Sequence, residues 1–226
     1  MSDPNVFESE RREMVELQIR RRGIRDARVL EAMSIVPRHE FVLPEHVGAA
    51  YEDRPLPIGE RETISQPYMV AAMSVAAGVE PGEKALEVGT GSGYQAAILA
   101  QLGARVYTIE KNVQLADAAR MRLARLGYSQ VDVVCGDGSD GYPVAAPYNI
   151  VVVTAGAPKV PPALVEQLAE GGRLVIPVGS LQRQDLFVVF KHGCETVTRV
   201  LDPCMFVPLV GKQGWHENQG QGTSDE

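Results

Sequence analysis

The sequence predicts an α/β fold in which a doubly wound, mostly parallel sheet carries helices on both faces. Three features of the 226-residue chain indicate this fold. From Lys84 onward short apolar runs alternate with helical stretches, the first run ends in a glycine-rich loop at residues 89–93, and two extended segments near the C-terminus are separated by His192-Gly193. Such alternation is typical of parallel strands joined by crossover helices. The last two segments predict an antiparallel pair at the edge of the sheet.

Two helices are predicted ahead of the sheet. Residues 8–22 are strongly charged with a narrow apolar face, which indicates a partly exposed helix that ends at Gly23. Asp26 is positioned to cap a second helix, which Pro37 stops. The basic residues 20–22 are typical of a solvated helix end, because cations are favoured near a helix C-terminus.

Residues 37–61 contain several prolines and glycines together with large apolar side chains. We therefore expect a packed, irregular segment, of the kind that often covers a binding site. The next stretch, Thr63-Ile64-Ser65-Gln66-Pro67, leads into an apolar run that ends at Gly78. This pattern predicts a helix with Ser65 as its N-cap and Gly78 as its C-terminal stop.

The strands and helices of the sheet follow in order. The run at 148–153 is the most apolar and is expected at the centre of the sheet. Glycine, asparagine or proline marks the element boundaries. We expect strands at 85–88, 105–109, 131–135, 148–153, 173–178, 186–190 and 196–201, and helices at 94–102, 113–126 and 160–169.

Composition narrows the class of protein. Hydrophobic residues make up 45% and charged residues 23% of the chain, as in soluble globular proteins. The formal charge of −7 disfavours a nucleic-acid partner, because such binding faces are usually strongly basic. No apolar run reaches the roughly 20 residues of a membrane span, and the N-terminus is polar rather than signal-like. We expect a cytoplasmic monomer with no nucleic-acid or membrane partner.

Cysteine and histidine form no metal-binding or nucleophilic pattern in the sequence. The cysteines are expected to be free thiols packed as small apolar side chains, and the histidines to be structural or on the surface. No metal site is predicted. The residues concerned are Cys135, Cys194, Cys204, His39, His46, His192 and His216.

The glycine loop predicts that a ligand lies close to the backbone. Gly89, Gly91 and Gly93 can adopt positive φ, and amides at the start of the following helix can hold a polar or anionic group. Tyr94 replaces the third glycine of the dinucleotide fingerprint, and no Gly-Lys-Ser/Thr follows. Nicotinamide and flavin sites, and the phosphate-binding loop of nucleoside triphosphatases, are therefore disfavoured.

Polar residues at the ends of the parallel strands indicate a nucleoside site. In an open α/β sheet, ligands bind beyond the carboxyl ends of the strands. Glu110 ends the second strand, where a carboxylate can hold ribose hydroxyls, and Asp137 follows the third, where it can accept a hydrogen bond from an exocyclic amine such as that of adenine. Gly138 lets the backbone approach closely. The loop at 154–157 is expected to face the same cleft.

Several motifs together resemble one enzyme family. The run Leu86-Glu87-Val88-Gly89-Thr90-Gly91-Ser92-Gly93-Tyr94 is similar to the first motif of S-adenosylmethionine-dependent methyltransferases. The stretches Thr63–Pro67, Cys135–Gly138, Thr154–Pro158, Gly171–Gly179 and Phe206–Leu209 add a resemblance to the protein-L-isoaspartate O-methyltransferases. The likeness runs from about Met14 to Trp215. It implies a Rossmann-like methyltransferase fold.

The resemblance also implies a division of the chain, which we expect to be a single domain over residues 1–226. Residues 1–78 would supply the N-terminal helices and a substrate-covering segment, and 79–180 the cofactor-binding core. Residues 181–215 would hold the C-terminal strands and a substrate segment, and 216–226 a polar tail.

The implied activity is methyl transfer from S-adenosylmethionine to the free α-carboxylate of L-isoaspartyl residues, with D-aspartyl residues as a further candidate. The product then enters repair through a succinimide. Ser65 falls on the active-site serine of the family, and Ile64, Ser65, Val207, Pro208 and Leu209 would bind the substrate peptide. The implied cofactor contacts are Glu87, Gly89, Thr90, Gly91, Ser92, Gly93, Glu110, Lys111, Asp137 and Gly138.

This chemistry needs alignment more than proton transfer. A carboxylate is ionised at neutral pH and a sulfonium methyl is already activated, so no strong general base is required. No activating base lies near Ser65 in the sequence, and we expect it to orient the substrate carboxylate or main chain. The segment Phe206–Leu209 is expected to be extended and to pair with the main chain of a peptide.

Some positions depart from the family pattern. Arg61 and Glu62 stand where glycine and glutamine are usual, Asn149 replaces a common acidic residue, and Cys204-Met205 replace a basic or branched residue. Two other functions stay open at this point. One is a methyltransferase that acts on a small molecule, and the other is a non-catalytic module that binds the nucleoside cofactor as a sensor or scaffold.

Overall fold

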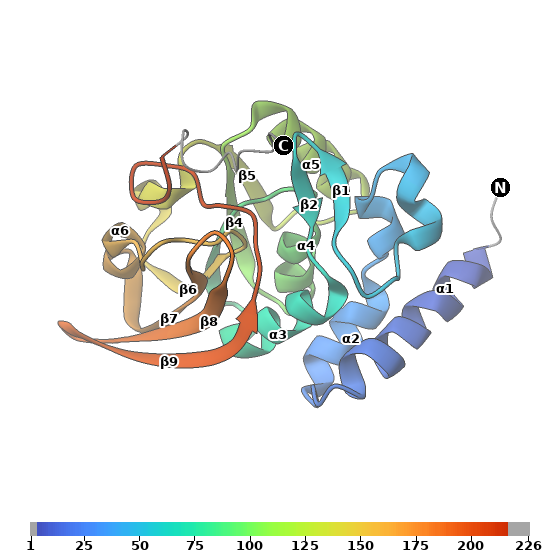
Figure 1. Cartoon of the computed structure of the whole chain (residues 1–226), viewed down its shortest axis with the longest axis horizontal. Helices are drawn as coiled ribbons and strands as arrows, with labels where there is room; N and C mark the ends of the chain where they lie inside the picture. Colours follow the sequence, from blue (N-terminus) through green and yellow to red (C-terminus); the bar gives the residue numbers. More distant parts are fainter. Residues whose placement is uncertain (1–3, 217–226) are drawn as a thin grey trace.

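The computed structural model describes residues 4–216 and contains a seven-stranded sheet between two helical layers (Figure 1). The strand order is β5-β4-β3-β6-β7-β8-β9. Strands β3 to β7 pair in parallel and the last two antiparallel, which confirms the predicted fold class. The strands are β3 Lys84–Val88, β4 Arg105–Glu110, β5 Val131–Cys135, β6 Tyr148–Val153, β7 Leu168–Gly179, β8 Gln184–His192 and β9 Glu195–Cys204.

The two faces of the sheet bury alternate residues of each strand, as a pleated strand requires. Ala85 and Val152 belong to the larger core cluster, which lies against α3 (Pro67–Ala77) and α4 (Tyr94–Gln101). Leu86 and Val153 belong to the second cluster on the opposite face. The helix α5 (Val113–Arg125) contributes to the larger cluster, and α6 (Pro162–Glu166) to the second.

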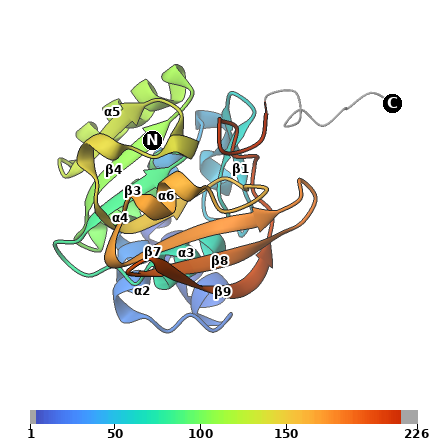
Figure 2. The same ribbon diagram turned by 90° about the vertical axis from the view of Figure 1, so that its left-hand side faces the viewer.

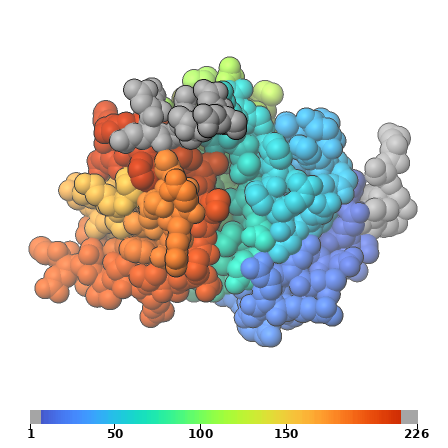
Figure 3. Space-filling view, in the orientation of Figure 1, coloured from blue at the N-terminus to red at the C-terminus, as the bar shows by residue number. Residues whose placement is uncertain are grey.

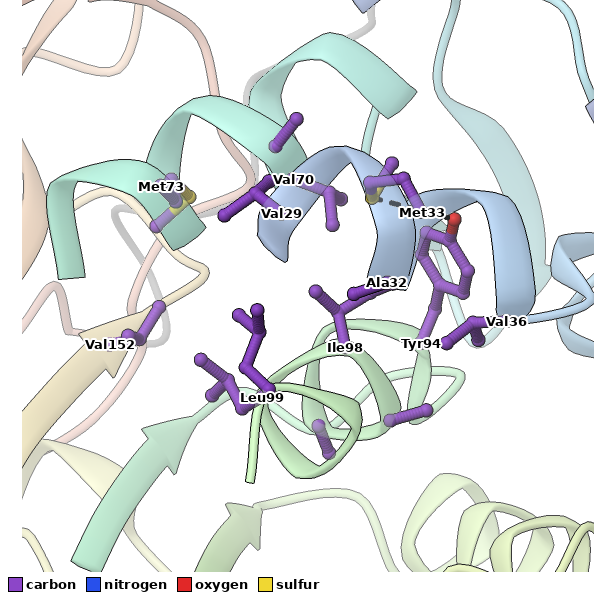
Figure 4. Close-up of a cluster of buried hydrophobic side chains, with 14 of the residues drawn as sticks. Val29, Ala32, Met33, Val36, Val70, Met73, Tyr94, Ile98, Leu99 and Val152 are labelled. Carbon is purple, nitrogen blue, oxygen red and sulfur yellow. Dashed lines mark hydrogen bonds between the residues drawn. The ribbon is translucent and has the colours of Figure 1, made fainter. Parts of the chain in front are cut away.

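The larger core ties the N-terminal helices to the sheet. Figure 4 shows side chains of α2 (Ala27–Ile35), α3 and α4 converging on one cluster, with Val152 of the sheet at its left-hand side. Met33 and Tyr94 are buried there, and the Tyr94 hydroxyl lies 3.9 Å from the Met33 sulfur. The predicted cap of α2 is confirmed, because Val29 N donates to Asp26 Oδ1 at 3.0 Å.

The N-terminal part follows the expected order with different boundaries. Helix α1 (Pro4–Glu13) continues into a π-helical segment, Met14–Arg20, and Gly23 follows with φ 103°. The irregular segment is packed, as expected. It contains two 3₁₀ turns, Arg38–Phe41 and Pro44–Ala49.

A small hairpin was absent from our expectations. Strands β1 (Leu56–Gly59) and β2 (Glu62–Ile64) pair antiparallel, and their tight turn places Glu60 and Arg61 at φ 54° and 61°. Positive φ favours glycine, which is the usual residue of the family pattern at position 61. Figure 1 shows the hairpin beside the carboxyl end of the sheet.

Three expectations about local structure were wrong. Helix α3 begins at Pro67 with Gln66 at the N-cap position, so Ser65 does not cap it. Helix α6 spans only Pro162–Glu166, because β7 already starts at Leu168. A bulge around residues 171–172 then shifts the register of β7 against β6. Strands β8 and β9 are longer than predicted, and their hairpin projects from the body of the molecule in Figure 1 and points toward the viewer in Figure 2.

The cysteines correct a fourth expectation. Cys135 and Cys194 are exposed, because the first ends the edge strand β5 and the second lies in the β8–β9 turn, while Cys204 is half-buried. Across residues 4–216, no helix has the length and apolar character needed to cross a bilayer. The tail predicted at 216–226 lies outside the described residues except for His216.

Candidate functional site

A cleft opens at the carboxyl ends of β3 and β6, where the chain order of the sheet reverses. Ligands of open α/β sheets bind at this switch point. The empty space is about 860 Å³, its open mouth included. The glycine loop, the end of β4, the β1–β2 hairpin and the C-terminal segment all line it. Lining residues are Glu62–Ser65, Val70, Glu87–Ser92, Tyr94, Gln95, Ile109–Lys111, Gly138, Thr154, Ala155 and Val207–Val210.

The glycine loop has the predicted backbone, and it also accommodates its protein neighbours. Gly89, Gly91 and Gly93 have φ of 94°, 51° and 87°. A Cβ on Gly89 would lie 2.5 Å from Thr154 Oγ1, and one on Gly91 would lie 3.3 Å from Ile58 Cδ1 of the hairpin. Side chains at these positions would therefore clash with the walls of the cleft as well as with a ligand.

Glu87 lies at the floor of the cleft. Its side chain is fully buried, and Thr108 Oγ1 donates to Oε2 at 2.5 Å. Thr90 shares a hydroxyl contact of 2.7 Å with Thr108, which connects the acid to the loop above it. Burial raises the pKa of Glu87 to about 8, with the Thr108 hydrogen bond opposing and the charge of Glu110 adding to the shift. The group is therefore mostly protonated at neutral pH.

Glu110 joins the glycine loop to the start of α5. Its Oε2 accepts from Gly91 N at 2.9 Å and its Oε1 from Asn112 N at 3.0 Å. Because each carboxylate oxygen has two lone pairs, acceptor capacity is left for hydroxyl groups in the cleft. Asn112 also reaches the hairpin, and its Nδ2 donates to Glu60 Oε2 at 3.1 Å.

Asp137 is engaged by the chain itself. Its Oδ1 accepts from Ser139 N and Oγ at 2.9 and 2.7 Å, and its Oδ2 from Lys212 N at 2.9 Å. Burial raises the pKa of Asp137, but these hydrogen bonds outweigh it and hold the pKa below its usual value. Asp137 and Gly93 are the two predicted cofactor residues outside the cleft lining. The adenine contact of Asp137 stays a prediction.

Ser65 lies at the boundary between two cavities. A second hollow of about 1500 Å³ adjoins the cleft and shares Thr63, Ser65, Thr154 and Val207 with it. Figure 3 shows the orange and red C-terminal segments meeting the teal segment on this face of the molecule. Within residues 4–216, the Ser65 hydroxyl makes no hydrogen bond with the protein.

The second hollow is lined mainly by apolar and aromatic side chains. Among them are Tyr68, Met69, Met205 and Phe206. Arg22 also lines it, with its guanidinium carbon 3.4 Å from the centre of the Tyr68 ring. Such a surface, flexible through its methionines, can adapt to different side chains of a peptide.

The segment Phe206–Leu209 is extended, but part of its main chain is already paired. Gly156 N donates to Val207 O at 2.7 Å, and Leu209 N donates to Gly156 O at 2.8 Å. These two groups are not available to a substrate. The main chain of Phe206 is engaged as well, because its N donates to Gln184 Oε1 at 2.8 Å and its O accepts from Gln184 Nε2 at 3.3 Å. A peptide can still pair with the Pro208 carbonyl, which makes no hydrogen bond with residues 4–216.

Arg38 holds the backbone at Ser65, and the sequence did not predict this role. It is fully buried, with Nε donating to Ala50 O at 2.8 Å and Nη2 to Ser65 O at 2.7 Å. Its guanidinium carbon lies 4.9 Å from the centre of the Tyr94 ring. Burial lowers the pKa of Arg38 to about 10, so it stays charged at neutral pH. A buried arginine carries no signal in sequence periodicity, because arginines are mostly exposed.

Other lining residues also escaped the sequence analysis. Val70, Tyr94 and Gln95 come from the first turns of α3 and α4, and their helical periodicity indicates packing as much as binding. Glu62 was noted only as a departure from the family pattern. Asn149, another departure, lies outside the cleft, where its Oδ1 accepts from Lys84 N at 3.0 Å.

The buried carboxyl of Glu87 makes stability depend on pH. Its pKa is higher in the folded than in the unfolded chain, so folding retains a proton between about pH 4.5 and 8. Stability from this group is present below that window and is lost as pH rises, by up to about 1.4 kcal/mol per pH unit. Glu87→Gln should flatten this slope, as urea unfolding at pH 5.5, 7 and 8.5 will measure. Equal slopes in both proteins would contradict the assignment.

Removing the Arg38 guanidinium should destabilise the fold and disturb Ser65. Arg38→Met leaves the Ala50 and Ser65 carbonyls unpaired, at a cost of about 2–4 kcal/mol. Arg38→Lys keeps a cationic donor and should reduce the free energy of unfolding by less. The urea midpoints of unfolding should fall in the order wild type, Arg38→Lys, Arg38→Met. An Arg38→Met variant as stable as the wild type would refute this prediction.

Comparison with known proteins identifies the family. A family model described as protein-L-isoaspartate(D-aspartate) O-methyltransferase matches residues 9–214. The protein-L-isoaspartate O-methyltransferase of Koribacter versatilis is 52% identical over 213 residues, 94% of this chain and 96% of that protein. The enzyme of the same name from Methanoculleus marisnigri is 53% identical over 206 residues, 91% and 94% of the two chains.

Solved structures share the fold. One protein-L-isoaspartate O-methyltransferase structure has a TM-score of 0.80 at 32% identity and covers 90% of this chain and 67% of its own. A structure from Plasmodium falciparum, in complex with S-adenosyl-L-homocysteine, has a TM-score of 0.75 at 24% identity, with 87% and 96% covered. From the match over nearly its whole length, the chain belongs to the protein-L-isoaspartate(D-aspartate) O-methyltransferase family.

Proposed function

We propose that this chain transfers a methyl group from S-adenosylmethionine to the free α-carboxylate of L-isoaspartyl residues in damaged proteins or peptides. The methyl ester then enters repair through a succinimide. The observation that carries this proposal is the wall shared by the two cavities, which contains Ser65 and Val207. One cavity suits a nucleoside cofactor and the other an extended peptide, so their reacting groups can meet at this wall.

The residues of the cleft fit the cofactor of the family, S-adenosylmethionine. Glu110 offers acceptor oxygens for ribose hydroxyls, and Ile109 and Ala155 form apolar surface that suits a base. Gly138 is required for this shape, because a Cβ there would lie 2.5 Å from Val88 Cγ1. We assign cofactor contacts to the loop from Gly89 to Gly93 and to Glu110, Lys111 and Gly138. Glu87 and Asp137 support them from behind.

Orientation is the main task of the protein in this reaction. When bound, S-adenosylmethionine supplies an activated methyl group, and the substrate carboxylate is already ionised at neutral pH. We assign Ser65 to donate a hydrogen bond that orients the substrate carboxylate or main chain. Because its hydroxyl has no protein partner in residues 4–216, it is free to do so. The backbone at Ser65 is fixed by the hydrogen bond from Arg38.

Ile64, Val207, Pro208 and Leu209 are assigned to the substrate side. All four line the cleft, and Val207 also lines the second hollow. A small-molecule substrate is less consistent with this arrangement, since it gives no reason for a second, mainly apolar hollow beside the cleft. The sensor alternative gives no reason for the Ser65 segment. We also infer a cytoplasmic monomer without a nucleic-acid partner, in keeping with the net charge of −7.

Paired peptides test the activity directly. The purified chain should methylate a peptide with one isoaspartyl residue and leave the matched aspartyl peptide unmodified. Transfer of a radiolabelled methyl group from S-adenosylmethionine measures the methylation of each peptide. Equal transfer to the two peptides, or transfer to neither, would contradict the proposal.

Ser65→Ala should separate binding from turnover. We expect kcat/KM for the isoaspartyl peptide to fall about 10- to 100-fold, as for the loss of one hydrogen bond to a charged group. The affinity for S-adenosylhomocysteine, measured by calorimetry, should change little. Ser34→Ala, a half-buried serine on α2 outside both cavities, is the matched control. Unchanged kinetics in the Ser65 variant would remove its assigned role.

A further inference from the structure

The cleft contains a carboxyl group that the proposed mechanism does not use. Glu62 begins β2 of the hairpin and lines the cleft together with Glu87 and Glu110. Its side chain is half-buried, and within residues 4–216 no donor bonds to it. Glu110, by contrast, accepts two backbone hydrogen bonds, and Glu87 accepts one from Thr108. Glu62 is therefore the carboxyl of the cleft that has no protein partner in the described chain.

The charged groups around Glu62 come from every wall of the cleft. Glu110 ends β4 and Lys111 follows it, Glu87 belongs to β3, and Arg61 precedes Glu62 in the hairpin. Burial first, and the charge of Glu110 second, together raise the pKa of Glu62 to about 7. Both effects arise in the free protein. A positive charge in the cleft would oppose them and favour the carboxylate.

The cofactor and its product differ by one unit of charge. S-adenosylmethionine carries a sulfonium, an ammonium and a carboxylate group, and so has a net charge of +1 at neutral pH. After methyl transfer the sulfonium becomes a neutral thioether, and the net charge falls to zero. A carboxylate in the cleft thus attracts the methyl donor more strongly than the spent cofactor.

We propose that Glu62 couples cofactor binding to proton release in this chain, and so favours S-adenosylmethionine over S-adenosylhomocysteine. Binding of the methyl donor favours the ionised carboxyl, which releases its proton to solvent. When the sulfonium charge is lost in the reaction, the protonated form of Glu62 is favoured again. S-adenosylhomocysteine is then bound less tightly than S-adenosylmethionine. The proposal rests on the assignment of the cleft to this cofactor, and it concerns binding rather than peptide recognition.

The sign of the pH dependence follows from linkage. A ligand that lowers the pKa of a group binds more tightly as pH rises through the pKa of the free protein. If ligand binding lowers the pKa of the group by one unit, the affinity for the ligand increases about tenfold as pH rises across this range. Affinity for S-adenosylmethionine should therefore rise several-fold between pH 6 and 8.5, and that for S-adenosylhomocysteine should rise less.

Isothermal titration calorimetry at pH 7 in two buffers of different ionisation enthalpy counts the protons released. The wild type should release up to about half a proton more than Glu62→Gln on binding S-adenosylmethionine, because about half of the carboxyls start protonated. The α-amino group of the ligand titrates equally in both proteins, so their difference is the readout. Glu62→Ala, a second variant, should match Glu62→Gln.

Glu60→Gln is the matched control. Glu60 lies in the same hairpin but outside the cleft lining, and glutamine keeps an oxygen to accept from Asn112. This variant should release as many protons as the wild type. Equal release by the wild type and Glu62→Gln, proton uptake, or the same difference with S-adenosylhomocysteine would overturn the proposal while leaving the methyltransferase function intact. Absence of any S-adenosylmethionine binding by the wild type would remove the cofactor assignment as well.

Discussion

The buried guanidinium of Arg38 connects the parts of the chain that form the site. It bonds to carbonyls on both sides of the hairpin, at Ala50 and Ser65, and faces the ring of Tyr94 at the start of the helix that follows the glycine loop. A desolvated charge is costly, and only fixed dipoles and a ring face offset the cost. The two hydrogen bonds therefore fix Ser65 within the N-terminal segment, and the contact with the Tyr94 ring joins this segment to the cofactor half.

Three carboxyl groups in one cleft are driven toward different protonation states by their surroundings. Glu87 is enclosed under the loop and stays mostly protonated, while Glu110 offers its oxygens to two backbone amides. Glu62 is only half-buried, and no donor between residues 4 and 216 bonds to it. The same chemical group thus serves as a neutral support, as a fixed acceptor and as a group whose charge responds to the ligand.

The sequence was sufficient to predict the order of the sheet elements and most of the cleft lining. Glycine spacing and strand-end acids are local signals, and they located residues 89–92, Glu110 and Gly138 correctly. Contacts between distant segments had no such signal. The hydrogen bonds of Asp137 to Lys212 and of Arg38 to Ser65 depend on the folded chain, and the turn of the β1–β2 hairpin uses Arg61 where a glycine would have marked it. Ser65 was misread as a cap because a proline two residues later is typical of helix starts.

The cleft also depends on residues near the end of the described chain. Residues 207–210 form one of its walls, and the backbone amides of Lys212 and Gln213 anchor that wall to Asp137 and Ser139. A ribosome finishes these residues after the whole sheet has been made. During synthesis the nascent protein can therefore fold its sheet while its site is still open on one side. The last wall of the cleft is added only when this segment returns to the strand ends.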